Sequence, residues 1–408
     1  MEDIFLVGVG MTPFSRLASA TVKGLTDLAV MSALKDADTT KSQIDAAFFS
    51  NTTQSPLEGQ YMVPGEMALR AMGFSDIPII NIENACASSS TALHTAYAHL
   101  RAGLCDTALV VGVEKMTHPD KSKSLQVFDG AWDVHDVEAT VSRLADLARD
   151  MEAPEDNNGP RSVFMDVYAA LARFHMKTFG TTQRQIAAVS EKNHFHSTFN
   201  PLAQYQVEMS VDQILAAPVI SWPLTLPMCA PVTDGAAAAI LVRKDGLRRF
   251  DADRAVKVCA SVLGSGSDRA PDDYEKHVCR RLAMKAYDIA GIGPSDISLA
   301  EVHDATAFAE IVQLENLGFC KFGEGGIISE RGETRLGGRI PVNLSGGLES
   351  KGHPIAATGL GQIYEMVTQL RGEAGQRQVD GARFAIAENG GGFHRYEEAV
   401  ACITILGR

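Results

Sequence analysis

The 408-residue sequence lacks the cysteine pairs that mark a zinc ribbon or a disulfide framework. Its seven cysteines are an odd number, and no two of them are separated by only two residues. None of the eleven histidines belongs to an HExxH pattern, so no metal site is predicted. Scattered, unpaired cysteines are typical of a reducing compartment, which favours a cytoplasmic protein.

The chain also lacks an excess of basic residues. It has 37 lysines and arginines against 50 aspartates and glutamates, a net charge of −13, which argues against nucleic acid as a partner. No run of about 18 uncharged apolar residues occurs, so no membrane span is predicted. The N-terminal MEDIFLVGVG places acidic residues, and no basic ones, before its apolar run, which predicts a first strand instead of a signal peptide.

Strand-like and helix-like segments alternate along the chain, which predicts an α/β fold. The segments SQIDAAFFSNTTQ (42–54) and SDISLAEVHDATA (295–307) begin alike and stand at similar places in two series of such segments. We therefore predict two similar halves, 1–248 and 249–408. The stretch of about 117–230 is less regular and is predicted to be a loop-rich insertion in the first half, with a functional role.

One cysteine stands at a strand-to-helix junction, in NIENACASSSTALHTA (81–96). Cys86 follows an apolar run and opens a segment of small residues, which leave the approach to its sulfur open. The N–H groups at a helix start favour the reactive thiolate. On these residues alone, Cys86 is either a nucleophile or a buried small apolar residue.

Two histidines occupy comparable positions. His353 lies in NLSGGLESKGHPIAATG (343–359), a glycine-rich turn before a predicted helix, and is a candidate base. His303 ends a predicted strand in EVHDATAFAE, where α/β proteins bind ligands, and is a candidate donor to an oxyanion. The alternative is that His303 has only a structural role, as a strand-end histidine hydrogen-bonded to Asp304.

Three consecutive glycines, Gly390 to Gly392, follow a predicted strand in AENGGGFHR. They are either a hairpin loop or a close-approach segment whose N–H groups form an oxyanion hole. Glu388 precedes them, and an apolar cleft would raise its pKa into the range of a general acid.

Taken in order, the segments NACASSSTALHTA, VVGVEKM, CAPVTDGAAAAILV, NLSGGLESKGHPIAATG and ENGGG resemble the thiolases over almost the entire chain. HDATAFAE resembles the sterol-carrier-protein branch, which has histidine where other thiolases use asparagine. The resemblance implies two βαβαβαββ halves that form a five-layer αβαβα core, with a loop domain inserted in the first half.

The same resemblance implies the chemistry. Cys86 attacks a 3-oxoacyl-CoA, His353 takes the thiol proton, and CoA is the co-substrate that collects the acyl group, with no permanently bound cofactor. His303 and His353 hold the enolate, while the N–H groups of Cys86 and Gly390, with Gly391 beside them, hold the tetrahedral oxyanion. Further residues of these segments, Ser345, Gly347 and Asn389, are predicted to contact substrate.

The sequence departs from the family at the second cysteine. Thiolases carry it in a C-x-G-G-G turn, or in H-D-C-F in the sterol-carrier branch, where this chain has Glu388 and Ala305. Either Glu388 replaces it and protonates the enolate, or the enzyme needs a different proton donor, or it does not cleave C–C bonds. Such atypical thiolases resemble enzymes for bulky or branched substrates, such as benzoylsuccinyl-CoA thiolase, several of which work with a small zinc-ribbon and OB-fold partner.

The resemblance also implies a homodimer core. Two alternatives stay open: a condensing acyltransferase on the same fold, and a non-catalytic acyl or lipid carrier. Lys121, Lys123 and Arg161 are basic residues of the connecting stretch that are available to CoA, although a solvated surface is the better explanation for any one of them.

Overall fold

The computed structural model describes residues 2–147, 149, 151, 153 and 159–408. Within these residues, nine strands pair in the order β3-β2-β4-β7-β1-β8-β11-β10-β9. The first half supplies β1 (Ile4–Met11), β2 (Ala46–Ser50), β3 (Ile79–Ile82), β4 (Thr107–Glu114) and β7 (Gly235–Arg243). The second half supplies β8 (Val256–Ser265), β9 (Leu299–Glu301), β10 (Phe384–Gly391) and β11 (Val400–Gly407).

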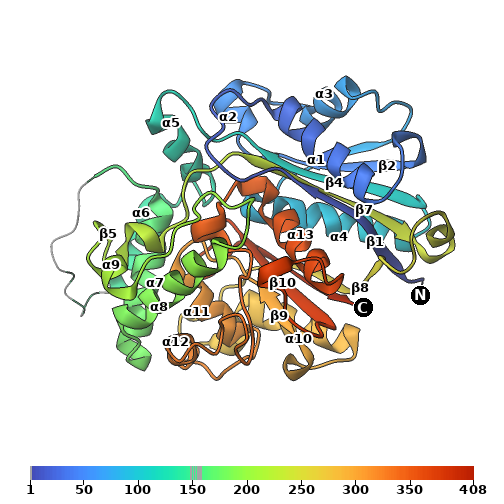
Figure 1. The fold of residues 1–408 in the computed structure, drawn as a ribbon. Coiled ribbons are helices and arrows are strands. Elements are labelled where there is room, and N and C mark those ends of the chain that lie inside the picture. The colour runs from blue at the N-terminus through green and yellow to red at the C-terminus, as the bar shows by residue number, and fades with distance from the viewer. Residues whose placement is uncertain (1, 148, 150, 152, 154–158) are drawn as a thin grey trace.

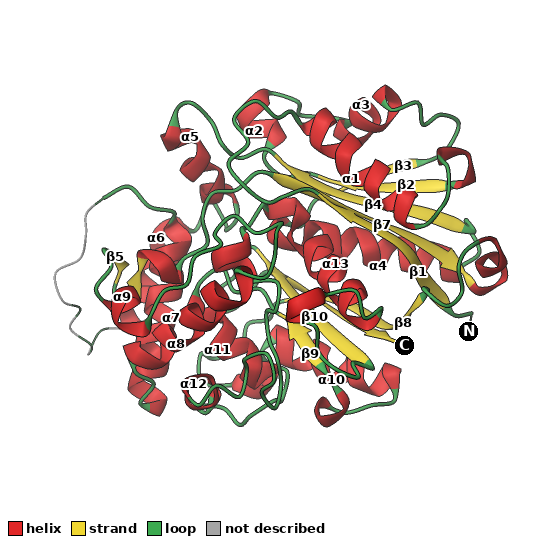
Figure 2. Cartoon of the chain, in the orientation of Figure 1, coloured by secondary structure: helices red, strands yellow, loops and turns green. Residues whose placement is uncertain are grey.

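The two halves meet at a narrow junction. Strands β1 and β8 pair only through Phe5 with Lys257 and Leu6 with Val256, and the sheet opens there into two blades (Figures 1 and 2). The strand order of one blade mirrors that of the other about this junction. In the second half, the counterpart of β3 is reduced to a single parallel bridge between Ala300 and Val342. The predicted repeat is therefore present in space, with one strand nearly lost.

Helices cover both faces of each blade. The covering helices are α1 (Val22–Asp36) and α3 (Pro64–Ala71) on the first blade, α10 (Val278–Ala290) and α11 (Ala307–Asn316) on the second, and α4 (Ser88–Arg101) and α13 (Thr358–Leu370) between the blades (Figure 1). The largest apolar cluster lies around α4 and α13, and separate clusters lie under α1 and α10. This confirms the predicted α/β core of five layers.

The burial of the strands explains their sequences. All eight residues of β4, TALVVGVE, are buried, as expected for a strand covered by helices on both faces. Helix α1 begins at Thr21, whose hydroxyl accepts the Gly24 N–H at 3.1 Å. No helix of the described residues is long and apolar enough to cross a membrane.

The insertion of about 117–230 is helical, whereas the sequence predicted loops. It contains α5 (Lys121–Gln126), α6 (Val137–Leu147), α7 (Val163–Phe179), α8 (Gln183–Ser197), α9 (Val211–Leu215) and the short strands β5 (Val219–Ser221) and β6 (Leu224–Thr225). The Ser162 hydroxyl caps α7, Gly180 ends it with a φ of 77°, and Thr182 and Gln185 form a capping box on α8. These caps were readable in the sequence, but the surrounding polar stretches hid them. Two short helices complete the described elements, α2 (Gln54–Glu58) and α12 (Gly325–Glu330).

Candidate active site

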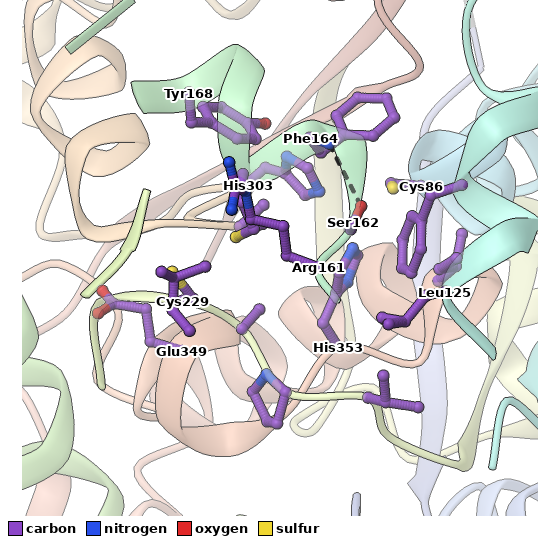
Figure 3. Close-up of a pocket in the computed structure, with 18 of the residues that line it drawn as sticks. Cys86, Leu125, Arg161, Ser162, Phe164, Tyr168, Cys229, His303, Glu349 and His353 are labelled. Atoms are coloured by element: carbon purple, nitrogen blue, oxygen red, sulfur yellow. Dashed lines mark hydrogen bonds between the residues drawn. The ribbon is translucent and has the colours of Figure 1, made fainter. Parts of the chain in front are cut away.

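Three candidate residues from both halves converge at the ends of the two central helices. Cys86 lies in a short 3-10 turn (Ala85–Ala87) before α4, and His353 lies just before the matching turn (Ile355–Ala357) that precedes α13. His303 follows β9. The Cys86 sulfur and one ring nitrogen of each histidine lie within 4.8 Å of one another, and the two imidazole rings pack edge to face with centroids 5.2 Å apart (Figure 3). The fold thus brings the thiol of Cys86 together with two imidazoles that lie 217 and 267 residues further along the chain.

The turn that carries Cys86 is strained and closely packed. Ala85 has a φ of 48°, a left-handed conformation that costs a non-glycine residue about 1–3 kcal/mol. Gly391 of β10 passes directly against this turn, because a Cβ on Gly391 would stand 2.3 Å from the Asn84 carbonyl oxygen and 2.8 Å from the Ala87 nitrogen. The second glycine of the triple is therefore required by close approach to the nucleophile turn.

The small residues after Cys86 serve helix packing. Ser89 is fully buried and its hydroxyl accepts the Leu360 N–H of α13 at 3.1 Å. The Ser90 hydroxyl donates to Asn389 Oδ1 at 2.7 Å, and a Cβ on Gly359 would lie 2.0 Å from the Ser90 oxygen. These small side chains let α4 and α13 cross closely, and that they also keep the thiol accessible stays a prediction.

The thiol of Cys86 is held in its neutral form. Burial, and next the nearby carboxylates Glu114 and Glu83, raise the pKa of Cys86 to about 12. The expectation that the helix start favours a resting thiolate is therefore not met, because desolvation outweighs the helix dipole. A base beside the sulfur is needed to generate the nucleophile.

His353 is oriented to be that base. Its Nδ1 lies 2.6 Å from the Thr358 oxygen, and the Thr358 hydroxyl donates to the Pro354 carbonyl at 3.1 Å. Because that hydroxyl proton is committed, Nδ1 carries the imidazole proton and Nε2 keeps its lone pair. Burial, followed by the neighbouring His303 and Lys351, lowers the pKa of His353 well below its usual value, so the ring is neutral near pH 7.

His303 offers a donor that no protein group occupies. Both of its ring nitrogens are buried and, within the part of the chain that the structure describes, neither has a hydrogen-bond partner. Burial lowers the pKa of His303 to about 4, which keeps the ring neutral with one N–H to donate. A buried donor without a partner costs free energy, and such a cost is expected where a substrate atom completes the bond.

A large cavity opens in front of these groups. Its volume is about 620 Å³, and the reacting groups Cys86, His303 and His353 lie in its wall. Most of the remaining wall is apolar and comes largely from the helical insertion, with Val127, Phe128, Met165, Val207, Met209 and Ile220. Leu125, Phe164 and Tyr168 of the same insertion also line it (Figure 3). Gly390 also lines the cavity, as predicted for an oxyanion-hole residue.

Glu388 does not lie where it was predicted. It is fully buried and is not part of the cavity wall. Its Oε2 accepts the backbone N–H of His303 at 2.9 Å, and its Oε1 accepts from the Cys279 thiol at 3.3 Å. Glu388 therefore holds the backbone of His303 from outside the cavity wall.

The three predicted substrate contacts are also set back from the cavity. Ser345 is buried and donates to Glu301 at 2.5 Å, and Asn389 is buried against Ser90 between the central helices. Gly347, with a φ of 61°, allows the close approach of Asp304, whose carboxylate would lie 2.1 Å from an added Cβ. These residues shape the backbone of the site and are outside its wall.

The three basic residues selected in the insertion differ in whether they line the cavity. Arg161 lines the cavity and pairs with Asp166 at 2.9 Å, whereas Lys121 and Lys123 are exposed on α5 outside the wall. Arg16, which sequence reasoning did not select, is exposed and lines the cavity at the same time, so it marks the opening.

Other wall residues were also missed. Phe164 and Tyr168 lie one turn apart on α7, and the sequence carries no signal beyond an apolar helix. Glu398, in the wall as well, stands in an ordinary stretch before β11. Only the fold reveals that these residues share a cavity with Cys86.

The two mirrored halves and the site between them together indicate the enzyme family to which the chain belongs. Residues 4–214 match the family described as "Thiolase, N-terminal domain" and residues 265–408 match "Thiolase C-terminal domain-like". The chain belongs to the thiolase family, and it is an acyltransferase enzyme.

Three individual proteins are similar to this chain over most of its length. The chain is 36% identical over 397 residues to an acetyl-CoA acetyltransferase of Methanothermobacter thermautotrophicus, covering 96% of this chain and 97% of that protein. It is 30% identical over 383 residues to the benzoylsuccinyl-CoA thiolase subunit BbsB of Thauera aromatica, covering 93% and 92%. It is 34% identical over 398 residues to sterol carrier protein 2 of Bos taurus, covering 95% of this chain and 69% of that protein.

Solved structures show the same fold. The structure titled Ltp2-ChsH2(DUF35) aldolase matches with a TM-score of 0.78 at 21% identity, covering 99% of this chain and 97% of that one. Human mitochondrial 3-ketoacyl-CoA thiolase in complex with CoA matches with a TM-score of 0.67 at 16% identity, covering 100% and 98%.

Proposed function

We propose that this enzyme cleaves a bulky, aromatic or branched 3-oxoacyl-CoA with CoA through an acyl-Cys86 intermediate. Conversion of benzoylsuccinyl-CoA to benzoyl-CoA and succinyl-CoA is the leading example. The observation that carries the proposal is the position of the Cys86, His303 and His353 groups in the wall of a large apolar cavity.

In the first step, His353 Nε2 removes the proton of the Cys86 thiol. The thiolate attacks the 3-oxo carbon, and a C–S bond forms. The bond between carbons 2 and 3 then breaks, the acyl group stays on Cys86, and the electron pair becomes a thioester enolate. Splitting the cleavage through a covalent intermediate replaces one difficult step by two easier ones.

Two donor sites stabilise the negative charges. The neutral His303 N–H, with His353 once it is protonated, is proposed to hold the enolate oxygen; the absence of a protein partner on either His303 nitrogen, within the described residues, supports this role. The backbone N–H groups of Cys86 and Gly390 are proposed to hold the tetrahedral oxyanion. In the second half of the reaction, the CoA thiolate attacks the acyl-Cys86 carbonyl and Cys86 leaves as a thiolate. One preorganised donor is worth about 3 kcal/mol of transition-state stabilisation.

The choice of substrate rests on the wall of the cavity. A cavity of about 620 Å³ lies in the range of sites for drug-sized ligands, more than an acetyl group requires. Phe128 and Phe164 present aromatic rings to an acyl group, and their centroids lie 6.3 Å apart. The similarity to the Thauera aromatica subunit points in the same direction.

We further propose a homodimer core that works with a small zinc-ribbon and OB-fold partner. Strand β3 lies at the edge of the first blade, and Tyr61 and Met62 near it are 74% and 75% exposed, which suits pairing with a second copy. For a second protein, the support is the word "subunit" in the name of the Thauera relative and the two components in the aldolase title. Light scattering of the purified chain tests the dimer, with a mass near 44 kDa as the contrary result.

The test of the activity is intact-protein mass after mixing with a panel of acyl-CoA and 3-oxoacyl-CoA esters, followed by peptide mapping. We expect a mass gain on the Cys86 peptide that disappears when free CoA is added, and the increment names the acyl group. The Cys86→Ser variant is the matched control and should not give an adduct that free CoA removes. A folded wild-type protein that forms no adduct with any ester contradicts the proposal.

A further inference from the structure

The reaction proposed above needs an acid for the enolate at carbon 2, and the structure sets Glu388 behind the wall. A second carboxyl group, Glu398, is part of the wall itself. Its side chain is 13% exposed, whereas Glu388 is 0% exposed. The inference that follows rests on the proposed function and concerns this group.

Glu398 lies directly beside the oxyanion-hole glycine. A Cβ on Gly390 would stand 2.5 Å from Glu398 Cγ, so the missing side chain of Gly390 makes room for this glutamate. Glu398 shares the cavity with Cys86 and both catalytic histidines. Tyr168 lines the same cavity, and burial, followed by the Glu398 carboxylate, raises the pKa of its phenol. Glu398 therefore faces the space in which a substrate on Cys86 would lie.

The carboxyl group of Glu398 is oriented by donors from two helices. Gln313 of α11 donates to Oε1 at 3.0 Å, and the Cys279 thiol of α10 lies 3.6 Å from Oε2. His277 Nε2 also lies 3.6 Å from Oε2. His277 Nδ1 accepts the Cys279 N–H at 3.3 Å, which places the imidazole proton on Nε2, where it points at Glu398. The imidazole N–H thus faces the carboxylate from 3.6 Å, just beyond hydrogen-bond distance.

Cys279 joins the two glutamates. Its sulfur lies between Glu388 Oε1 at 3.3 Å and Glu398 Oε2 at 3.6 Å, and it has one proton to donate. Burial, and next the carboxylates Glu398 and Glu388, raise the pKa of Cys279, so it stays a thiol. Burial also raises the pKa of both glutamates; the carboxylate of Glu398 raises that of Glu388 further, to about 8, and the carboxylate of Glu397 raises that of Glu398. Glu388, beside Cys279 and Glu398, therefore holds a proton next to the cavity wall at neutral pH.

We propose that Glu398 is the catalytic acid and base at carbon 2 and at the CoA thiol, and that Cys279 and Glu388 are positioning residues behind it. In the cleavage step, the Glu398 O–H bond breaks and its proton forms a C–H bond with carbon 2 of the enolate. The electron pair of the O–H bond stays on Glu398, which becomes a carboxylate, and the shorter acyl-CoA leaves.

The second half of the reaction restores the acid. The Glu398 carboxylate takes the proton of the incoming CoA thiol. The CoA thiolate attacks the acyl-Cys86 carbonyl, a new C–S bond forms, and the Cys86 sulfur leaves with its electron pair. His353, protonated in the first step, returns its proton to Cys86. The balance closes with no oxidant, reductant or further reactant.

The test separates carbon protonation from acyl transfer. The probes are benzoylacetyl-CoA, whose cleavage needs a proton at carbon 2, and benzoyl-CoA, which acylates Cys86 with release of a thiolate. A thiolate leaves without much help from an acid, because thiol pKa values lie near 8.5, whereas a carbon enolate needs a proton donor. For Glu398→Gln we expect cleavage to fall by at least about 100-fold, while benzoylation of Cys86 stays within about tenfold of the wild type.

The Glu83→Gln variant is the control for the loss of a negative charge near Cys86. Glu83 also lies near Cys86 and raises its pKa, but it is exposed and its Oε1 accepts the Ala85 N–H, which a glutamine oxygen still accepts. We expect this variant to cleave benzoylacetyl-CoA within about threefold of the wild type. Glu398→Asp, which keeps the charge but withdraws the carboxyl group, should lose cleavage by about tenfold or more and keep benzoylation.

Two results overturn the inference: cleavage by Glu398→Gln within about threefold of the wild type, or equal losses of cleavage and benzoylation in a folded variant. If Glu398→Gln fails to fold, Glu398→Asp decides on the same two rates. Failure of wild-type benzoylation on Cys86 contradicts the proposed function instead, so the two failures are distinct.

Discussion

Removal of the His303 ring tests whether this side chain stabilises the enolate. The two ring nitrogens are buried without a protein partner, and the pKa near 4 keeps the ring neutral at pH 7. Its N–H is therefore free to bind the enolate oxygen in a site shielded from water. A donor of this kind is worth about 3 kcal/mol, so we expect His303→Ala to lower kcat for benzoylacetyl-CoA cleavage by about 150-fold.

The variant His303→Asn restores an amide N–H and should recover at least about tenfold of that loss. Benzoylation of Cys86 from benzoyl-CoA forms no enolate and should change by less than about fivefold in both variants. His94→Gln, at a half-buried histidine that bonds Ser261 away from the cavity, is the control and should keep wild-type kcat. A loss below about fivefold in His303→Ala, or equal losses in the alanine and asparagine variants, would refute the reasoning.

Further predictions concern protons and the fit of the acyl group. Thr358→Val removes the acceptor that holds the Nδ1 proton of His353, and kcat/KM should fall by about 10- to 100-fold in steady-state assays. Since the neutral form of His353 is the base and its pKa lies well below 6.5, kcat/KM should stay level from pH 7 to about 6 and fall only at lower pH. It should also fall at alkaline pH, as Glu398, whose pKa is raised by burial, loses its proton. A pH–rate profile checks both limbs, and an acid limb centred near pH 6.5 contradicts the first expectation. The unfolded state protonates His303 near 6.5 and the folded state near 4, so this residue contributes about 3 kcal/mol of stability that is lost as pH falls between these values. In urea denaturation, the stability of His303→Asn should therefore decline by about 3 kcal/mol less than that of the wild type over this range. Phe164→Ala should lower kcat/KM for benzoylacetyl-CoA by about tenfold or more and affect acetoacetyl-CoA less, and equal effects on both esters would contradict an aromatic pocket.

Much of the fold was predictable because it depends on local patterns. The apolar run before Cys86, the small-residue helix after it and the repeat of segment 42–54 at 295–307 all mark backbone structure directly. The helices α7 and α8 were missed, because their caps stand between polar stretches that resemble loops. The near loss of the strand at Val342 was not visible either, since a single bridge leaves no periodic pattern.

The sequence also determined which side chains are able to react. A thiol at a strand-to-helix junction and a histidine in a glycine-rich turn are local features, so Cys86 and His353 could be selected before any contact was known. The order and the spacing of the motifs around these two residues then resembled those of the thiolases.

Protonation and exposure depended on the tertiary structure. Burial makes Cys86 a weak acid despite its helix start, and the hydroxyl of Thr358 decides which nitrogen of His353 is the base. Packing also decides which carboxyl group faces the substrate: Glu388 and Glu398 are only ten residues apart, yet one lies behind His303 and the other in the cavity wall. Desolvation and proton position depend on neighbours from both halves of the chain, and only the folded arrangement of the two blades sets them.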